Sequence, residues 1–350
     1  MRDIDLHNTA VTDAQINNAR QELLREISKE SRPIRHGRRR WLGVSALVGG
    51  VAATAVAISV LTPTQIDPAA AAVLENAADV TITAIDTTLT PDQYLRIQTD
   101  GDQLWQWDEG MGDEAWERFN SSDRADAEAG LIVRETRVLY VPADRSGDWI
   151  WDWSADPQVI ATYGTRADEA AADWTEQEAA SDSGYWPDLQ ALPGGEIPAA
   201  EGDDTQYLLD SYRPVYDQMP RDPQALLDWF RARSGDPNVN DQWVVDALTD
   251  VLTANLMPAE LRAALLRALA LVPGIRVSDV NGTAATLEYQ SGDWLYTRTT
   301  EITLDTELGM ITSLAQTTSN NVIGSDTIPT TVPDTRTSVT TTVVGDAPTP

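Results

Sequence analysis

The sequence predicts an α+β domain with an antiparallel sheet covered by helices, preceded by one N-terminal transmembrane helix and followed by a disordered C-terminal tail. Three observations support this fold class. Segments with alternating apolar residues come first and last in the outer part, with three helical segments between them, an order typical of α+β domains. An uncharged apolar run occupies 41–61, and 319–350 is rich in Thr and Pro with little charge.

The apolar run from Trp41 to Leu61 is long enough to cross a bilayer. No charged residue interrupts it, and as a helix it would be about 30 Å long, the thickness of the hydrocarbon core. Arginines precede it, among them Arg38, Arg39 and Arg40, whereas the next basic residue after it is Arg96. Because Lys and Arg stay in the cytoplasm, the N-terminus is expected inside, with Trp41 at the membrane interface.

The same run has an alternative interpretation as a cleaved signal peptide, with alanines 69–72 as the processing site. Its apolar core is longer than the 7–15 residues typical of secretory signals. An uncleaved single span is therefore expected, with the bulk of the chain outside the cell membrane.

Residues 1–40 are expected to be a cytoplasmic amphipathic helix and a basic linker. Thr12 is a candidate N-cap, with Gln15 three residues later. The apolar positions recur at helical spacing and define a partner face: Ile16, Ala19, Leu23, Leu24 and Ile27. This face could bind a cytoplasmic protein or the inner leaflet, or the segment could be a tether with no binding role.

Charge divides unevenly at the predicted span. Residues 1–40 hold nine Lys or Arg and six Asp or Glu, whereas the rest holds sixteen and forty-nine, so the two parts carry +3 and −33. An exterior this acidic repels nucleic acid and anionic headgroups, so no nucleic-acid partner is expected.

The chemistry available outside is narrow. The chain has no cysteine, and its two histidines, His7 and His36, both precede the span. Disulfides, thiolate nucleophiles, histidine-ligated metals and Ser–His–Asp hydrolysis are thereby excluded from the outer domain. No phosphate-binding loop is present, because the sole lysine is Lys29. We expect neither an enzyme, nor a cofactor, nor a metal site.

The outer α+β domain is expected over 64–318. Its predicted strands before the helices are 80–85, 94–99, 103–107, 131–142 and 148–153, with a hairpin turn at Asp100-Gly101. An acidic surface insertion with one short helix is expected over 155–220. Three helices then begin near Asp222, Asn240 and Pro258, and a meander of strands follows at 275–280, 284–290, 294–305 and 310–317.

Tryptophans mark the strands before the helices. Alternate strand residues share a face, so five rings are expected on one side of the sheet: Trp105, Trp107, Trp149, Trp151 and Trp153. They could line a cavity for an apolar or sugar-like ligand, or they could form a filled core under the helices.

Several segments together resemble an actinobacterial family of single-pass membrane proteins whose genes often lie beside those of extracytoplasmic-function sigma factors. They are NNARQELLREI, PDQYLRIQT, VLYVPADRSGDWIWDWS, DPQALLDWFRAR and, most specifically, MPAELRAALLRALALVPGIRV. The order of elements is also similar to the half-barrel of lipoprotein carriers and of the periplasmic sigma-E regulator RseB. That likeness implies a curved antiparallel sheet closed by helices around an apolar cavity.

The resemblance implies a membrane-anchored sensor or regulatory protein, with a sigma factor as a possible cytoplasmic partner. One departure is that the zinc motif of many anti-sigma factors is absent, since the chain has no cysteine. Two alternatives stay open: a binding or carrier module for a lipid or another apolar ligand that needs no cytoplasmic partner, and a surface protein without a ligand.

Overall fold

The computed structural model describes residues 65–83, 89–119, 124–180, 188–197, 207–234, 240–321 and 327–350. The expected cytoplasmic helix, basic linker and membrane span fall within 1–64 and lie outside these ranges. None of the helices in the described parts of the chain combines the length and apolar composition needed to cross a bilayer.

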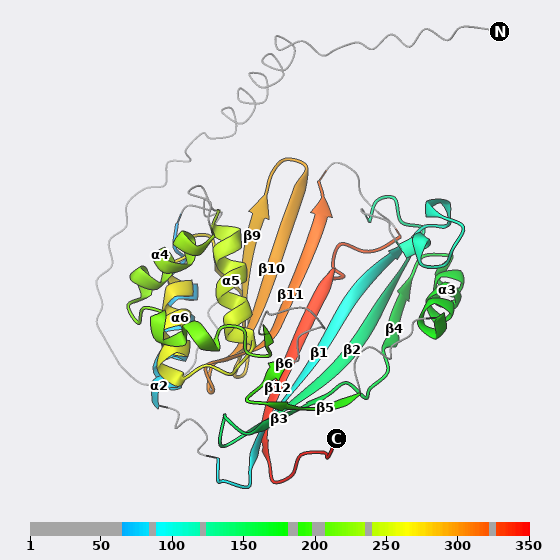
Figure 1. Cartoon of the computed structure of the whole chain (residues 1–350). Helices are drawn as coiled ribbons and strands as arrows, with labels where there is room; N and C mark the ends of the chain where they lie inside the picture. Colours follow the sequence, from blue (N-terminus) through cyan, green and yellow to red (C-terminus); the bar gives the residue numbers. More distant parts are fainter. Residues whose placement is uncertain are drawn as a thin grey trace, which may run out of the picture. The chain divides into compact units, whose positions relative to one another are not determined.

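An open, curved antiparallel sheet of ten strands organises the domain, as Figure 1 shows, so the expected α+β class is confirmed. Its strand order is β5-β3-β2-β1-β12-β11-β10-β9-β8, and β4 also pairs with β2. The strands on the β1 side are β1 (Tyr94–Trp107), β2 (Ala129–Pro142), β3 (Asp148–Asp152), β4 (Gln158–Tyr163) and β5 (Leu189–Pro193). Those on the other side are β8 (Arg276–Asn281), β9 (Ala284–Gly292), β10 (Tyr296–Asp305), β11 (Met310–Asn320) and β12 (Thr335–Val344).

The predicted hairpin turn at Asp100-Gly101 is wrong, because β1 runs unbroken through both residues. Gly101 lies opposite Glu135 of β2 on one side and Thr337 of β12 on the other. An Asp-Gly pair favours a tight turn only where the chain is free to reverse. Here the two neighbouring ladders hold it extended.

The prediction of a disordered tail over 319–350 is also wrong, because part of this segment forms a strand of the sheet. Residues 335–344 form β12, which pairs with β1 from Gln103↔Thr335 to Tyr94↔Val344. The segment is rich in Thr and Val, which suit strands, and Val339 is only 6% exposed. Its composition cannot build a core alone, but it can complete a sheet that other strands have already formed.

One segment predicted as a strand is part of a helix, and the three predicted helices after residue 220 are confirmed. Of the strand expected over 80–85, residues 80–83 belong instead to the end of α2 (Pro68–Thr83), and the other two lie outside the described ranges. Small and apolar side chains at helical spacing bury one side of α2: Ala70, Leu74, Ala77, Ala78 and Thr81. The predicted helices appear as α4 (Pro223–Arg233), α5 (Asp241–Thr253) and α6 (Ala259–Ala270). Asp222 and Asn240 cap the first two by accepting from backbone N–H groups.

The region 155–220, predicted as an acidic surface insertion with one short helix, contains several further elements. The expected helix is present as α3 (Ala167–Ala180), but β4 and β5 join the main sheet on either side of it. A small hairpin of β6 (Glu196–Ile197) and β7 (Tyr207–Leu208) and a 3₁₀ helix, η4 (Arg213–Gln218), follow. Weak periodicity concealed β4 because its residues are mostly exposed.

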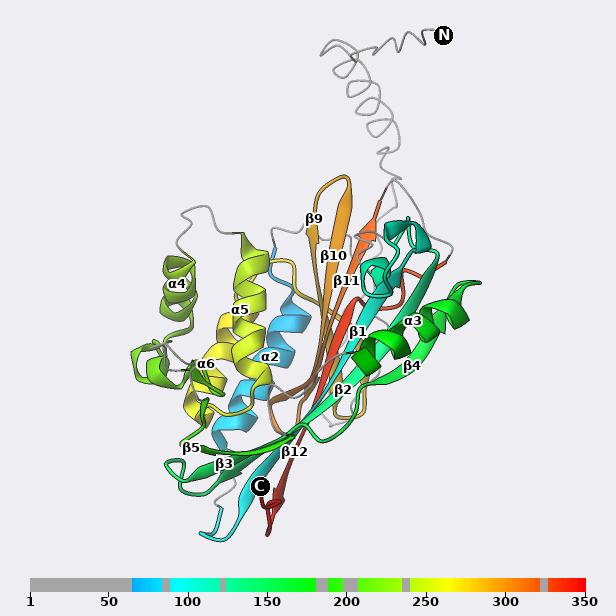
Figure 2. The same cartoon turned by 45° about the vertical axis from the view of Figure 1, so that its right-hand side comes forward.

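All the packed helices lie on one face of the sheet. Directly paired residues of antiparallel strands share a face, and Gln103 pairs with Thr335, Thr335 with Gln316, and Gln316 with Thr300. Helices α2, α4, α5 and α6 cover this face over β8–β11, while α3 covers it near β2 and β4 (Figure 2). The middle of the face lies between these two covers.

Candidate functional site

The five tryptophans are divided between two clusters on the same sheet face. Trp105 and Trp107 pack with Phe119, Leu131 and Trp174 beneath α3, and Trp107 is 1% exposed. Trp149 and Trp151 pack at the other end of the long strands, with Trp149 fully buried. Trp153 is more open and stacks edge-on to Trp151, with ring centroids 4.7 Å apart.

A single cavity lined by all five rings is therefore ruled out for the described residues. Trp105 and Ile97, which mark the two clusters on β1, are eight positions apart. At about 3.3 Å per residue this separates the clusters by roughly 26 Å. Trp107 and Trp149 are filled core, as the alternative interpretation held.

A hollow of about 250 Å³ lies between the clusters, on a stretch of the face that none of the described helices covers. Its lining comes from β1, β2 and β12: Thr99, Gly101, Asp102, Gln103, Trp105, Val133, Glu135, Arg137, Thr335, Arg336 and Thr337. Gly101 contributes to the space because it carries no side chain at the centre of the face, and Thr337 is a short neighbour. Sequence reasoning missed this site because β12 supplies part of it.

The charged pair in the hollow is available to a ligand. Arg137 Nη2 donates to Glu135 Oε2 over 2.6 Å, and both side chains are nearly half exposed. Such an exposed pair stabilises a fold by only about 0–1 kcal/mol. The Arg137 guanidinium also lies 4.4 Å from the centre of the Trp153 ring. The Arg137 guanidinium, which lines the hollow, therefore lies beside both the Glu135 carboxylate and the Trp153 ring.

Most of the remaining lining is hydrogen-bonding rather than apolar. Gln103 supplies an amide, the threonines supply hydroxyls, and Trp105 and Val133 supply the apolar contact. An acyl chain would leave those polar groups desolvated without partners, which is unfavourable. A ligand with its own donors and acceptors and one apolar side fits this lining better.

A half-buried polar cluster adjoins the hollow beneath α5. The Asp246 carboxylate accepts from Gln242 over 2.8 Å and from Gln316 over 3.2 Å, and it pairs with Arg298 at 3.2 Å. Burial raises the pKa of Asp246, and the nearby Arg298 charge partly offsets this. Because Gln316 pairs with Thr335 of the hollow, hydrogen bonds connect α5 to the strands that line the hollow.

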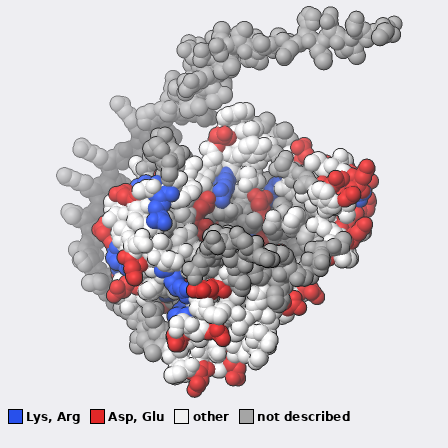
Figure 3. Space-filling view, viewed as in Figure 1, with Lys and Arg blue, Asp and Glu red and all other residues white. Residues whose placement is uncertain are grey.

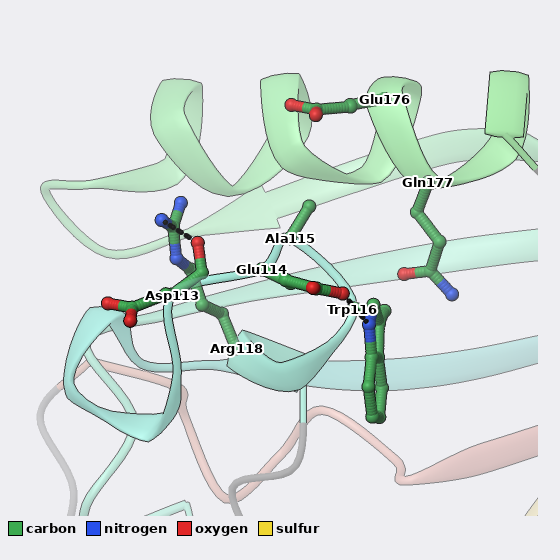
Figure 4. A pocket seen from close by; sticks show the side chains of 7 residues that line it. All are labelled: Asp113, Glu114, Ala115, Trp116, Arg118, Glu176 and Gln177. Carbon is green, nitrogen blue, oxygen red and sulfur yellow. Dashed lines mark hydrogen bonds between the residues drawn. The ribbon is translucent and has the colours of Figure 1, made fainter.

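A second hollow of about 530 Å³ lies at the α3 lobe, beside the short 3₁₀ helices η1 (Glu109–Met111) and η2 (Glu117–Phe119). Acidic side chains gather over this lobe at the right of Figure 3. Figure 4 shows its lining: Asp113, Glu114, Ala115, Trp116, Arg118, Glu176 and Gln177.

The groups in this second hollow are largely engaged with one another. Arg118 pairs with Asp173 at 2.9 Å and donates to the Gly112 and Asp113 carbonyls. Trp116 Nε1 donates to Glu114 Oε2 over 2.7 Å. These bonds close the loop between β1 and β2, so we assign it a structural role.

In the described ranges, no group of three or more Asp, Glu, His or Cys is placed to hold a metal ion. The partner face of Ile16, Ala19, Leu23, Leu24 and Ile27 and the orientation residues Arg38, Arg39, Arg40 and Trp41 lie outside those ranges. No protein-family model, curated protein or solved structure matches the chain.

Proposed function

We propose that this chain is a membrane-anchored binding protein of the cell envelope, with its sheet domain outside and the hollow on β1, β2 and β12 as its ligand site. The anchor and the orientation come from the uncharged run at 41–61 and the arginines before it. The observation that carries the binding role is the hollow itself, whose lining of polar groups and Trp105 lies on the sheet face between two helical covers.

A sugar-like ligand is the class that this lining supports best. Sugars combine hydroxyl groups with a flat apolar side, and the hollow offers Gln103 near Trp105, with Glu135 and Arg137 farther along the strands. The alternative of a lipid carrier is less well supported, because an acyl chain satisfies none of these polar groups.

The test is binding of mono- to tetrasaccharides to the full chain in detergent micelles, measured by calorimetry, with a phospholipid as competitor. We expect Gln103→Ala to weaken binding at least tenfold. Gln98→Ala is the matched control, because Gln98 lies on β1 with the opposite parity and faces away from the hollow. If phospholipid binds and the saccharides do not, the sugar-like assignment is wrong; if neither binds, the binding role fails.

We further propose that the protein is regulatory, with the cytoplasmic helix as its output. The amphipathic pattern at 13–29 supports this, and a sigma factor is the partner that the family resemblance implies. A pull-down with the full chain should recover a partner that is lost with Leu23→Asp and retained with Gln21→Asp, on the opposite side of the helix. Recovery of the same proteins by both variants would contradict the regulatory role.

A further inference from the structure

Large exposed aromatic side chains of the described residues gather at one end of the helix-covered half. Trp294, in the β9–β10 turn, is 77% exposed, and Tyr296, the first residue of β10, is 41% exposed. Trp243, in the first turn of α5, is 37% exposed. The two elements meet at this end, because Ser291 Oγ donates to the Gln242 side chain.

Hydrogen bonds hold the β9–β10 turn in place, although the Trp294 ring in it is exposed. Asp293 Oδ1 accepts from the Leu295 and Tyr296 N–H groups over 2.8 and 3.0 Å. These bonds lower the pKa of Asp293. Asn321 also donates to the Asp293 carbonyl over 3.1 Å. The carboxylate is therefore committed to the turn.

The opposite end of the same half exposes aliphatic residues instead. Leu308, in the β10–β11 turn, is 52% exposed, and Val280, near the end of β8, is 60% exposed. Successive turns of a meander lie at opposite ends of its strands, so the turns at Trp294 and Leu308 are separated by the length of β10. Among the described residues of this half, the large exposed aromatic side chains thus gather at one end.

The chain enters the domain at the aromatic end. Thr81, near the end of α2, donates to the carbonyl of Gly309 in the β10–β11 turn. The start of α2 therefore lies toward the other end, about 24 Å away along a 16-residue helix. Gln65 accepts from Gly274 near that start, and the predicted span ends at Leu61, only four positions earlier.

We propose that this aromatic end, comprising Trp243, Trp294 and Tyr296, rests against the outer surface of the bilayer, with its rings at the level of the lipid headgroups. The inference relies on the anchor of the proposed function. Trp and Tyr are the residues that favour this interface, because each combines an apolar ring with a polar group. So short a connection keeps the domain close to the membrane, and the −33 exterior makes a zwitterionic surface the suitable one.

Trp116 does not belong to this surface, although it is 55% exposed. It bonds to Glu114 and lies among the carboxylates of the α3 lobe. A membrane contact there would bring acidic groups to the lipid. The proposed contact is therefore confined to the β9–β10 turn and the start of α5.

The absence of native cysteine allows a direct test with single-cysteine variants of the full chain. Trp294→Cys and Tyr296→Cys report on the aromatic end, Leu308→Cys is the matched exposed turn at the opposite end, and Val51→Cys lies within the predicted span. Each is labelled with a nitroxide in phosphatidylcholine nanodiscs. Collision rates with oxygen, which partitions into lipid, are compared with those of a water-soluble nickel chelate.

We expect the ratio of oxygen to nickel collisions to be at least threefold higher at both Trp294→Cys and Tyr296→Cys than at Leu308→Cys, and highest at Val51→Cys. A lipid-like ratio at Val51→Cys with equal aqueous ratios at the other three sites would overturn the proposal and leave the anchor intact. Aqueous ratios at all four sites would overturn both. An equally raised ratio at Leu308→Cys would show that the contact is not specific to the aromatic end.

Discussion

Val339 of β12 offers the sharpest test of the C-terminal strand. Its side chain packs with Ile97, Val141, Trp149 and Leu256 in the cluster at one end of the long strands. Its neighbour Thr340 points to the opposite face and is exposed. Val339→Ala and Thr340→Ala therefore make a matched pair in which only the first removes buried atoms.

The expected loss follows from the atoms removed. Val339→Ala deletes two buried methyl groups, each worth about 0.8 kcal/mol of transfer free energy. The cavity that remains adds to this, so the free energy of unfolding should fall by about 2 kcal/mol. Thr340→Ala should change it by less than about 0.5 kcal/mol, as exposed substitutions usually do.

Urea unfolding of the full chain in micelles, followed by tryptophan fluorescence, measures both variants. With a slope of about 3 kcal/mol/M, the midpoint should fall by about 0.7 M for Val339→Ala and by less than about 0.2 M for Thr340→Ala. Equal small shifts would mean that 335–344 is not packed in the sheet. A larger shift for Thr340→Ala would mean that the register is off by one residue.

Three further predictions use the same unfolding assay. Gly309→Ala should lower the free energy of unfolding by about 2 kcal/mol or more, because φ is +63° and the new Cβ would lie 1.8 Å from Thr81 Oγ1. Adding Thr81→Ala should recover part of this loss, and no recovery would contradict the clash. Arg124→Ala should lower the free energy of unfolding by about 3 kcal/mol, because this 5%-exposed side chain donates to the Pro329 carbonyl over 2.8 Å and pairs with Asp334. A loss below about 1 kcal/mol would contradict its role in fixing the segment that leads into β12. Burial raises the pKa of Asp246, so its preference for the protonated form stabilises the fold below the ordinary value of about 3.9 and is lost as pH rises through the raised value. Asp246→Asn should therefore gain stability relative to the unsubstituted chain between pH 4 and pH 7, and a difference that stays constant with pH would contradict this.

Periodic segments whose neighbours in sequence are also neighbours in space were predictable. The three helices beginning near Asp222, Asn240 and Pro258 and the meander from β8 to β11 appear where the apolar spacing and the turn residues indicated. Their signals are local, because capping, helical spacing and hairpin turns depend on residues a few positions apart. Alternation also placed Trp105 with Trp107, and Trp149 with Trp151, on one face of their strands, whereas the pairing of those strands put both sets on the same side of the sheet.

Pairing between strands far apart in the sequence explains why the turn and the tail were predicted wrongly. The Asp100-Gly101 turn signal is overruled because β1 has a partner on each side, and one of those partners, β12, lies more than 230 residues later. The same pairing orders a Thr-rich segment that lacks the apolar content to order itself. The hollow escaped prediction for the same reason, since it exists only where β12 joins β1 and β2.

By itself the sequence determined the charge division, the absence of His and Cys after residue 61 and the elements formed by local pattern, because composition and spacing specify these directly. It also determined that Trp107 and Trp149 lie on strands, but not that they belong to separate clusters at opposite ends. Only the tertiary structure decided that separation, the polar character of the stretch between them and the gathering of exposed aromatics at the end where the chain enters. Each depends on residues brought together by strand pairing and helix packing across long separations, which no local pattern records.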